Sequence, residues 1–338
     1  MFRSIIAVSL IVIAGVSSGC SGQAEQAGQT QAQQHEQVWP EEVRDVELVS
    51  SVDGAVQMAK FYVPEQADGP LPLLVMLHTW SGSWTQDMGI DWLEQARQRG
   101  WVFIHSDFRG PNGKVESTGS ELATADIMDA LAYARRHANV DSSRIYLAGV
   151  SGGGHMSLLT AGRKPEIWAG VSAWVPIFDL ARWHTECVER ELGYAGQMEA
   201  ACGGVPGSSD ETDRQYLARS SKSVLHHAGG VNIEINAGIH DGHTGSVPVG
   251  HTLRAFNMLA TANGLAGKAL TEETIKEFES GEAVPDELAG ERTDDPFYGE
   301  KTVLFRRQAG PARVTVFEGG HEGIAAAACE WLSRQRHD

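Results

Sequence analysis

A single serine, Ser151, stands between an apolar run and a segment with helical spacing, and glycines flank it. Gly149, Ser151 and Gly153 form the G-x-S-x-G pattern of a nucleophile elbow. Such a turn from strand to helix is so tight that only residues without a Cβ fit beside the serine. The hydroxyl is then presented at a helix N-terminus, where backbone N–H groups favour a developing anion. The pattern therefore predicts acyl transfer through Ser151.

A glycine-rich turn between a strand and a helix is also typical of dinucleotide-binding proteins. Their G-x-G-x-x-G pattern needs a glycine where this chain has Ser151, because that glycine lets a pyrophosphate approach the backbone. We therefore favour the nucleophile and expect no cofactor.

A serine hydroxyl becomes reactive at neutral pH when a base accepts its proton and a third group orients that base. In elbow hydrolases the acid and then the histidine follow the serine along the chain. A strand predicted from Val314 runs through two glycines into His321, and a strand predicted from Ile233 ends near Asp241. We predict His321 as the base and Asp241 as the acid. Asp179, after the strand predicted at residues 168–175, is the alternative acid.

The histidines around Asp241 allow a second interpretation. His240, His243 and His251, together with Asp241, offer the imidazole and carboxylate ligands that zinc accepts. No His-Glu-x-x-His helix accompanies them, and the triad already needs the carboxylate. We therefore predict a polar turn here and no metal site.

Backbone N–H groups aimed at the carbonyl oxygen of the substrate stabilise the charge that forms there in the transition state. We expect one donor at Gly152 and the other at Thr79 or Trp80, in the loop after the strand predicted at residues 71–78. Substrate contacts are predicted for four tryptophans and one arginine, with packing under a cap or a structural ion pair as the alternative roles. These residues are Trp80, Trp84, Arg109, Trp174 and Trp183.

Buried apolar runs alternate with segments of helical spacing along most of the chain. Because parallel neighbours need crossover helices, this alternation predicts an α/β fold with a mostly parallel sheet covered on both faces. Function is then expected at the carboxyl ends of the strands. The predicted strands are residues 43–50, 55–63, 71–78, 101–107, 144–149, 168–175 and 231–238, and the predicted helices are residues 87–99, 118–137 and 153–162.

Two stretches interrupt the alternation. Residues 179–213 are predicted to form a cap over the site, cross-linked by a disulfide between Cys187 and Cys202. Residues 264–300 are acidic and polar, with one weak helix, and are predicted to be a surface excursion. Cys329, among alanines near the end of the chain, is expected to fill core space.

The N-terminal residues and the charge bear on location and partners. Residues 1–20 have the pattern of a bacterial lipoprotein signal, cleaved before a lipidated Cys20, and residues 21–38 have the composition of a disordered tether. The folded domain is then residues 39–338. We expect an exported protein, anchored in a membrane through Cys20 in preference to freely secreted. A formal net charge of −17 argues against nucleic acid and anionic lipid as partners.

Together these motifs resemble the α/β-hydrolase superfamily, and within it the secreted prolyl oligopeptidase-like and acetyl xylan esterase-like serine hydrolases. The resemblance covers roughly residues 43–336, and it implies an eight-stranded sheet, a Ser-Asp-His triad and no cofactor. We expect no β-propeller before the domain, unlike in true oligopeptidases. Three additional residues separate Asp241 from Val247 and Pro248, relative to the common D-x-x-V-P spacing. The motifs are those around His78–Gly82, Asp107–Asn112, Gly149–Gly154, His240–His243 with Val247 and Pro248, and Gly319–Glu322.

The sequence therefore predicts an exported serine hydrolase that cleaves esters of acylated carbohydrate or other small esters by an acyl-enzyme mechanism. A prolyl oligopeptidase-like peptidase is the first alternative. A non-catalytic binding protein that keeps the fold is the second. The oligomeric state is not predicted.

Overall fold

The computed structural model describes residues 38–65 and 69–337 of the 338-residue chain. The predicted signal peptide, the predicted lipidation site Cys20 and all but the last residue of the predicted tether lie outside the described residues. In the part of the chain that is described, no helix is both long and apolar enough to cross a lipid bilayer.

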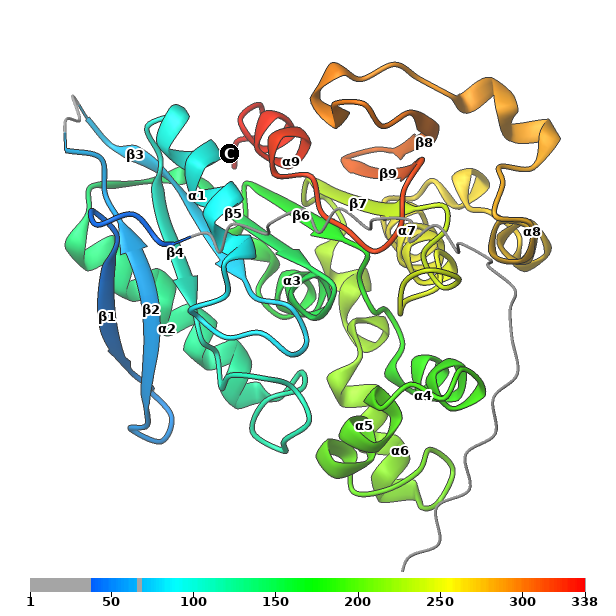
Figure 1. Ribbon diagram of the computed structural model, residues 1–338, viewed down its shortest axis with the longest axis horizontal. Helices are drawn as coiled ribbons and strands as arrows, with labels where there is room; N and C mark the ends of the chain where they lie inside the picture. Colours follow the sequence, from blue (N-terminus) through cyan, green and yellow to red (C-terminus); the bar gives the residue numbers. More distant parts are fainter. Residues whose placement is uncertain (1–37, 66–68, 338) are drawn as a thin grey trace, which may run out of the picture. The chain divides into compact units, whose positions relative to one another are not determined.

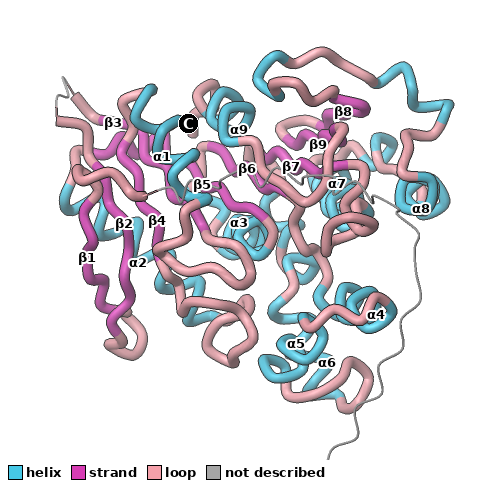
Figure 2. The backbone as a smooth tube through the Cα atoms, viewed as in Figure 1, coloured by secondary structure: helices cyan, strands magenta, loops and turns pink. Residues whose placement is uncertain are grey.

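Nine strands of the described domain form one sheet in the order β1-β2-β4-β3-β5-β6-β7-β9-β8 (Figures 1 and 2). The neighbours from β4 to β9 run parallel, while β1, β2 and β4 pair antiparallel at one edge and β8 and β9 at the other. The alternation of elements predicted this mostly parallel α/β sheet correctly. The strands are β1 (Arg44–Val49), β2 (Val56–Tyr62), β3 (Leu71–Leu77), β4 (Val102–Ser106), β5 (Val140–Val150), β6 (Gly170–Trp174), β7 (Ile233–Gly238), β8 (Val303–Ala309) and β9 (Ala312–Phe317).

The implied count of eight strands is one too low. The edge strand β8 was not predicted from the sequence. Its buried and less buried residues alternate, and Gly310, with φ of +64°, turns the chain back into β9. Alternation of this kind is weaker than the continuous apolar runs of the central strands, because only one face of an edge strand meets the core.

Helices cover both faces of the sheet (Figure 1). On one face α1 (Met88–Gln98) packs against α9 (Ala325–Leu332), and α2 (Glu121–His137), α3 (Gly152–Arg163) and α7 (Gly250–Ala262) lie on the other. Helix α2 begins where Ser120 accepts a hydrogen bond from the Ala123 amide, and it ends in basic residues that suit its dipole. Cys329 on α9 is fully buried. Within the predicted surface excursion, α8 (Glu272–Gly281) is the weak helix that the sequence indicated.

Three short helices between β6 and β7 form the cap insertion. They are α4 (Leu180–Glu189), α5 (Tyr194–Cys202) and α6 (Asp210–Arg219), and they gather below the sheet in the view of Figure 1. The insertion continues past the predicted limit at residue 213. Trp183, Met198 and Tyr216 form its small apolar core, which also includes Trp80 from the loop after β3.

The predicted disulfide between Cys187 and Cys202 is wrong. Both side chains are free thiols buried in the apolar core of the cap, where they pack as small hydrophobic groups. Burial raises the pKa of the Cys187 thiol to about 12 and that of Cys202 to about 11. The cap is therefore stabilised by packing, without a cross-link.

Candidate active site

The turn between β5 and α3 holds Ser151 in a strained conformation. Its φ is +59° and its ψ is −117°, and its amide donates a 2.8 Å hydrogen bond to the Trp174 carbonyl oxygen. A Cβ on Gly149 would lie 2.3 Å from the carbonyl oxygen of Gly153, and a Cβ on Gly153 would lie 2.3 Å from that of Leu77. Both glycines are therefore required by close backbone approach, as the elbow pattern predicts.

Ser151, His321 and Asp241 form one hydrogen-bonded line. His321 Nε2 lies 2.8 Å from Ser151 Oγ, and His321 Nδ1 lies 2.8 Å from Asp241 Oδ2. Because the carboxylate can only accept, Nδ1–H donates to Asp241 and leaves Nε2 to accept the serine proton. The Asp241 side chain is fully buried, whereas 22% of the His321 side chain is exposed. The structure thus brings together the three side chains proposed for the triad.

Three parallel strands deliver these side chains to the same end of the sheet; β7 and β9 are neighbours, and β6 separates β5 from β7. Ser151 follows β5, Asp241 follows β7 and His321 follows β9. The loops after β7 and β9 run close together, since a Cβ on Gly238 would lie 2.3 Å from the carbonyl oxygens of both Gly319 and Gly320.

Two backbone amides, those of Gly152 and Trp80, lie close together beside Ser151. A Cβ on Gly152 would lie 2.5 Å from the Trp80 nitrogen, so the two chain segments are in direct contact. Neither amide N–H has an acceptor among the described residues, as an oxyanion hole requires. The Thr79 alternative is wrong, because its N–H donates to Gln86 Oε1 at 2.9 Å.

A pocket of about 370 Å³ opens in front of Ser151. Trp80, Met88 and Val150 form apolar parts of its wall, and Tyr194 reaches it from the cap helix α5. Tyr194 was not predicted, because no sequence pattern in the irregular stretch before α5 indicates where the cap folds back. The pocket lining is completed by Thr79, Ser81, Ser151, His321, Glu322 and Gly323.

Three of the four predicted substrate-binding tryptophans do not line this pocket. Trp174 lies in the core, where its indole N–H donates to Ser172 Oγ at 2.8 Å. Trp183 is fully buried behind Trp80, with ring centroids 4.8 Å apart. Trp84 lies under the ammonium group of Lys60 instead. From the sequence, a tryptophan is equally suited to packing in the core and to binding substrate. Only the fold shows which of these two roles each tryptophan has.

Arg109 takes the structural role, and its predicted contact with substrate is wrong. Its guanidinium pairs with Asp126 at 2.5 Å and with Asp53 at 2.8 Å, and 8% of its side chain is exposed. The bonds to Asp53, and then those to Asp126, raise its pKa above the usual range despite partial burial. Arg109 is not among the residues that line the Ser151 pocket.

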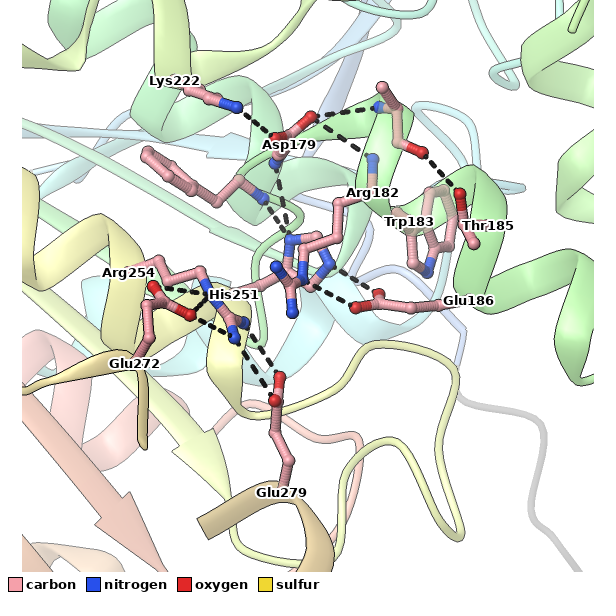
Figure 3. Close-up of polar contacts among 12 residues, drawn as sticks. Asp179, Arg182, Trp183, Thr185, Glu186, Lys222, His251, Arg254, Glu272 and Glu279 are labelled. Carbon is pink, nitrogen blue, oxygen red and sulfur yellow. Dashed lines mark hydrogen bonds and ion pairs between the residues drawn. The ribbon is translucent and has the colours of Figure 1, made fainter. Parts of the chain in front are cut away.

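Asp179, the alternative acid, begins helix α4 and lies outside the triad. Its Oδ1 accepts from the Ala181 amide, and its Oδ2 accepts from the Lys222 ammonium at 2.7 Å (Figure 3). Burial alone would raise the pKa of Asp179, but the hydrogen bond and charge of Lys222 hold it below the usual value. Asp179 therefore serves as a helix cap.

The histidines near Asp241 do not converge on a common point. His240 bonds to Glu282 and Glu318, His243 to the Glu279 carbonyl oxygen, and His251 to Glu186 at 2.8 Å. The hydrogen bonds to Glu318 and Glu282 raise the pKa of His240. Within residues 38–65 and 69–337, no group of three or more His, Cys, Asp or Glu side chains is arranged to hold a metal ion.

The fold and this site define a serine hydrolase with the α/β-hydrolase fold. Residues 89–264, just over half of the chain, match the prolyl oligopeptidase family, and the chain belongs to that family. The peptidase and esterase structures that resemble it share the α/β-hydrolase sheet.

Two curated relatives are feruloyl esterases B. The protein of Talaromyces funiculosus is 25% identical over 184 residues, which cover 48% of this chain and 52% of the relative. The protein of Talaromyces stipitatus is 30% identical over 129 residues, or 36% of each chain. The match therefore spans about half of the first relative's length and about a third of the second's.

Solved structures share the fold at low identity. The acetyl xylan esterase from Paenibacillus sp. R4 has a TM-score of 0.55 at 16% identity, over 88% of this chain and 86% of that one. A puromycin-hydrolyzing peptidase of Mycobacterium tuberculosis has a TM-score of 0.57 at 16% identity, over 86% of this chain and 38% of that one. The esterase thus resembles this chain along most of its own length, whereas the peptidase extends far beyond the shared fold.

Proposed function

We propose that this chain is an exported serine esterase that hydrolyses acylated carbohydrates or other small esters through an acyl-enzyme at Ser151. The observation that carries the proposal is the line of hydrogen bonds from Asp241 through His321 to Ser151, at 2.8 Å for each bond to His321. The amides of Gly152 and Trp80 support it, because they are close together and have no acceptor among the described residues, and a developing oxyanion needs such donors.

In the acylation step, Ser151 Oγ attacks the ester carbonyl carbon while His321 Nε2 accepts its proton. The carbonyl oxygen becomes an anion that the N–H groups of Gly152 and Trp80 stabilise. The imidazolium, held by Asp241, then gives its proton to the alcohol oxygen as the carbon–oxygen bond breaks. Water subsequently attacks the acyl group, and the same histidine returns a proton to Ser151.

The pocket favours a small acyl group. Its volume of about 370 Å³ and its walls of Trp80, Met88 and Val150 suit a short chain or a single ring, and the Tyr194 ring adds an aromatic side. The two curated relatives are named as feruloyl esterases, and one similar solved structure is named as an acetyl xylan esterase. A feruloyl group contains a single aromatic ring, and an acetyl group is a short acyl chain. We therefore favour these two kinds of acyl group.

A peptidase is the second candidate, because the chain belongs to a family named for prolyl oligopeptidases. A panel of p-nitrophenyl acetate, acetylated xylan, methyl ferulate and aminoacyl p-nitroanilides separates the two. The esterase predicts turnover of at least one ester and little hydrolysis of the anilides, with Ser151→Ala as the blank. Faster cleavage of an anilide than of any ester would overturn the choice.

Export through a lipidated Cys20 is a separate part of the proposal. It rests on the pattern of residues 1–20 alone. Expression of the full chain in bacteria with an alkyne fatty acid is expected to label the wild type and not Cys20→Ala. Equal labelling of both would contradict lipidation at Cys20.

A further inference from the structure

The loop of residues 242–246 follows Asp241, the proposed triad acid. It contains the three residues that are additional to the common D-x-x-V-P spacing. The amides of Gly242 and Val247 donate to Asp241 Oδ1 at 3.0 and 3.1 Å, so the loop closes around this carboxylate. A Cβ on Gly245 would lie 2.2 Å from Asp241 Oδ1 and 2.4 Å from His321 Cβ. The loop thus packs directly on both residues and leaves no room for a side chain at Gly245.

Ser246, the last residue of this loop, brings a second hydroxyl to the proposed base. Its Oγ lies 3.5 Å from His321 Nε2, the nitrogen that also meets Ser151 Oγ. The Ser246 hydroxyl has no other hydrogen-bond partner in the described part of the chain. It is therefore free to bind a molecule that enters the site.

The cap fixes the position of Ser246. The buried indole of Trp183 donates to the Ser246 carbonyl oxygen at 2.9 Å, and the Arg190 guanidinium donates to the same oxygen at 3.3 Å. Arg190 also donates to the Gly245 carbonyl oxygen. Three donors, one from Trp183 within α4 and two from Arg190 directly after it, therefore hold a two-residue segment in place.

We propose that Ser246 is a positioning residue that holds the hydrolytic water against His321 Nε2 during deacylation, an inference that rests on the proposed function. At 3.5 Å the direct contact between Ser246 Oγ and His321 Nε2 is weak, so both atoms can bond to a water that lies beside them. Once Ser151 Oγ carries the acyl group, its hydroxyl proton is gone and Nε2 needs a new donor. A water that donates to Nε2 and also bonds to Ser246 Oγ supplies that donor.

The deacylation step then balances with water as the only co-reactant. The water oxygen attacks the acyl carbon while Nε2 accepts one water proton. The tetrahedral intermediate collapses, and the bond from carbon to Ser151 Oγ breaks. The proton passes from Nε2 to Ser151 Oγ, and the product leaves as a carboxylic acid. Ser246 forms no covalent bond in this sequence.

Acylation does not use this water, so the two steps respond differently to a change at Ser246. For Ser246→Ala we expect deacylation of the acetyl-enzyme to slow about tenfold, the size of one lost hydrogen bond of ordinary strength. With p-nitrophenyl acetate, whose good leaving group makes acylation fast, kcat and KM are expected to fall together while kcat/KM stays unchanged. A burst of p-nitrophenol and the lifetime of the acetylated protein by intact mass spectrometry measure both steps.

Two further variants separate positioning from a general disturbance of the loop. Ser246→Thr keeps a hydroxyl and is expected to restore deacylation. Thr244→Ala lies in the same loop, but its hydroxyl bonds to the His240 carbonyl oxygen at 3.3 Å, so both steps are expected to stay as in the wild type. Titration with a fluorophosphonate corrects every rate for the fraction of folded sites.

The outcomes distinguish this inference from the proposed function. If Ser246→Ala slows acylation and deacylation equally, or changes neither, the role of Ser246 is overturned and the esterase stands. If the wild type releases no p-nitrophenol and forms no acetyl-enzyme, the proposed function itself fails.

Discussion

Two pockets of the described domain differ in size and in the state of the polar groups that line them. The pocket at Ser151 measures about 370 Å³, whereas the pocket lined by Phe178, Lys222 and Met258, among others, measures about 710 Å³. In the larger pocket, charged side chains already satisfy one another (Figure 3): Lys222 pairs with Asp179, and Arg254 pairs with Glu272.

The smaller pocket has the opposite character. The amides of Trp80 and Gly152 lack acceptors among the described residues, and the hydroxyl of Ser151 points at an imidazole that can accept its proton. Polar groups without a partner cost free energy in a folded protein, so a cluster of them is retained where a ligand or transition state supplies the missing partner. In this protein, polar groups that lie together without partners indicate the site of chemistry better than the volume of a pocket does.

The two aspartates that follow neighbouring strands test this difference most strongly. Asp241→Asn is expected to lower kcat on p-nitrophenyl acetate about 10⁴-fold, because an amide cannot hold the imidazole in the required tautomer. Asp179→Asn, at the larger pocket, is expected to leave kcat close to the wild-type value, because asparagine also caps a helix. A similar loss of kcat in both variants would contradict the assignment of catalysis to the smaller pocket alone.

Replacement of Arg109 is expected to have the next largest effect, which is a loss of stability. Arg109→Met leaves the carboxylate of Asp126, whose side chain is 1% exposed, without its counterion. We expect the free energy of unfolding in urea to fall by about 3 kcal/mol. The KM for small esters is expected to stay unchanged.

Lys222→Met is the matched control for Arg109→Met. Its pair with Asp179 is half-exposed, so we expect a loss below about 1 kcal/mol. A raised KM in Arg109→Met at unchanged stability would restore the predicted contact of Arg109 with substrate.

The sequence predicted the parts of the site that local chemistry determines. The G-x-S-x-G turn needs Gly149 and Gly153 in any chain that forms it, and strand order places Asp241 and His321 at the same edge as Ser151. These predictions required no knowledge of distant contacts. The choice between Asp241 and Asp179 does depend on distant contacts, because both residues follow a strand. Only the fold shows that Lys222 and the α4 amides donate hydrogen bonds to the Asp179 carboxylate.

The errors share a physical cause. Arg109, Trp174 and Trp183 are large side chains at strand ends or in the cap, where the same residue type can line a cavity or fill the core. Their roles depend on partners far away in sequence, such as Asp53 for Arg109 and Ser246 for Trp183. Cys187 and Cys202 were paired by proximity in the chain, whereas the packing of the cap helices buries the two thiols as separate side chains.

His155, a buried histidine beside the elbow, is expected to make the stability of the protein depend on pH, with a smaller effect than that of Arg109. Burial lowers the pKa of His155 to about 4, and its Nε2 has no partner in the part of the chain that the structure describes. Between about pH 6.5 and 4 the unfolded chain therefore binds a proton that the folded chain does not. This contribution to stability is fully present above pH 6.5 and falls by up to roughly 1.4 kcal/mol per pH unit as the pH decreases.

Urea unfolding at pH 7 and pH 5 measures this effect. His155→Asn keeps an N–H donor for the Ile177 carbonyl oxygen, to which His155 Nδ1 bonds at 3.0 Å, and cannot be protonated in this range. The variant is expected to lose less stability between the two pH values than the wild type. An identical loss would show that His155 does not carry the effect.

The smallest expected effect concerns the cap. With Cys187 and Cys202 as free thiols, the melting temperature is expected to be the same with and without dithiothreitol. A disulfide closing a loop of this length would contribute about 3 kcal/mol, and its reduction would lower the melting temperature by several degrees. Such a decrease would show that Cys187 and Cys202 form a disulfide.

Labelling with a fluorophosphonate shows directly whether His321 and Asp241 activate Ser151. The reagent reacts with an activated serine and forms a covalent bond that intact mass spectrometry and peptide mapping locate. We expect one adduct on Ser151 of the wild type, no adduct on Ser151→Ala, and greatly slowed labelling of His321→Ala. Absence of labelling in folded wild-type protein, or an adduct on a different residue, would contradict the activation of Ser151.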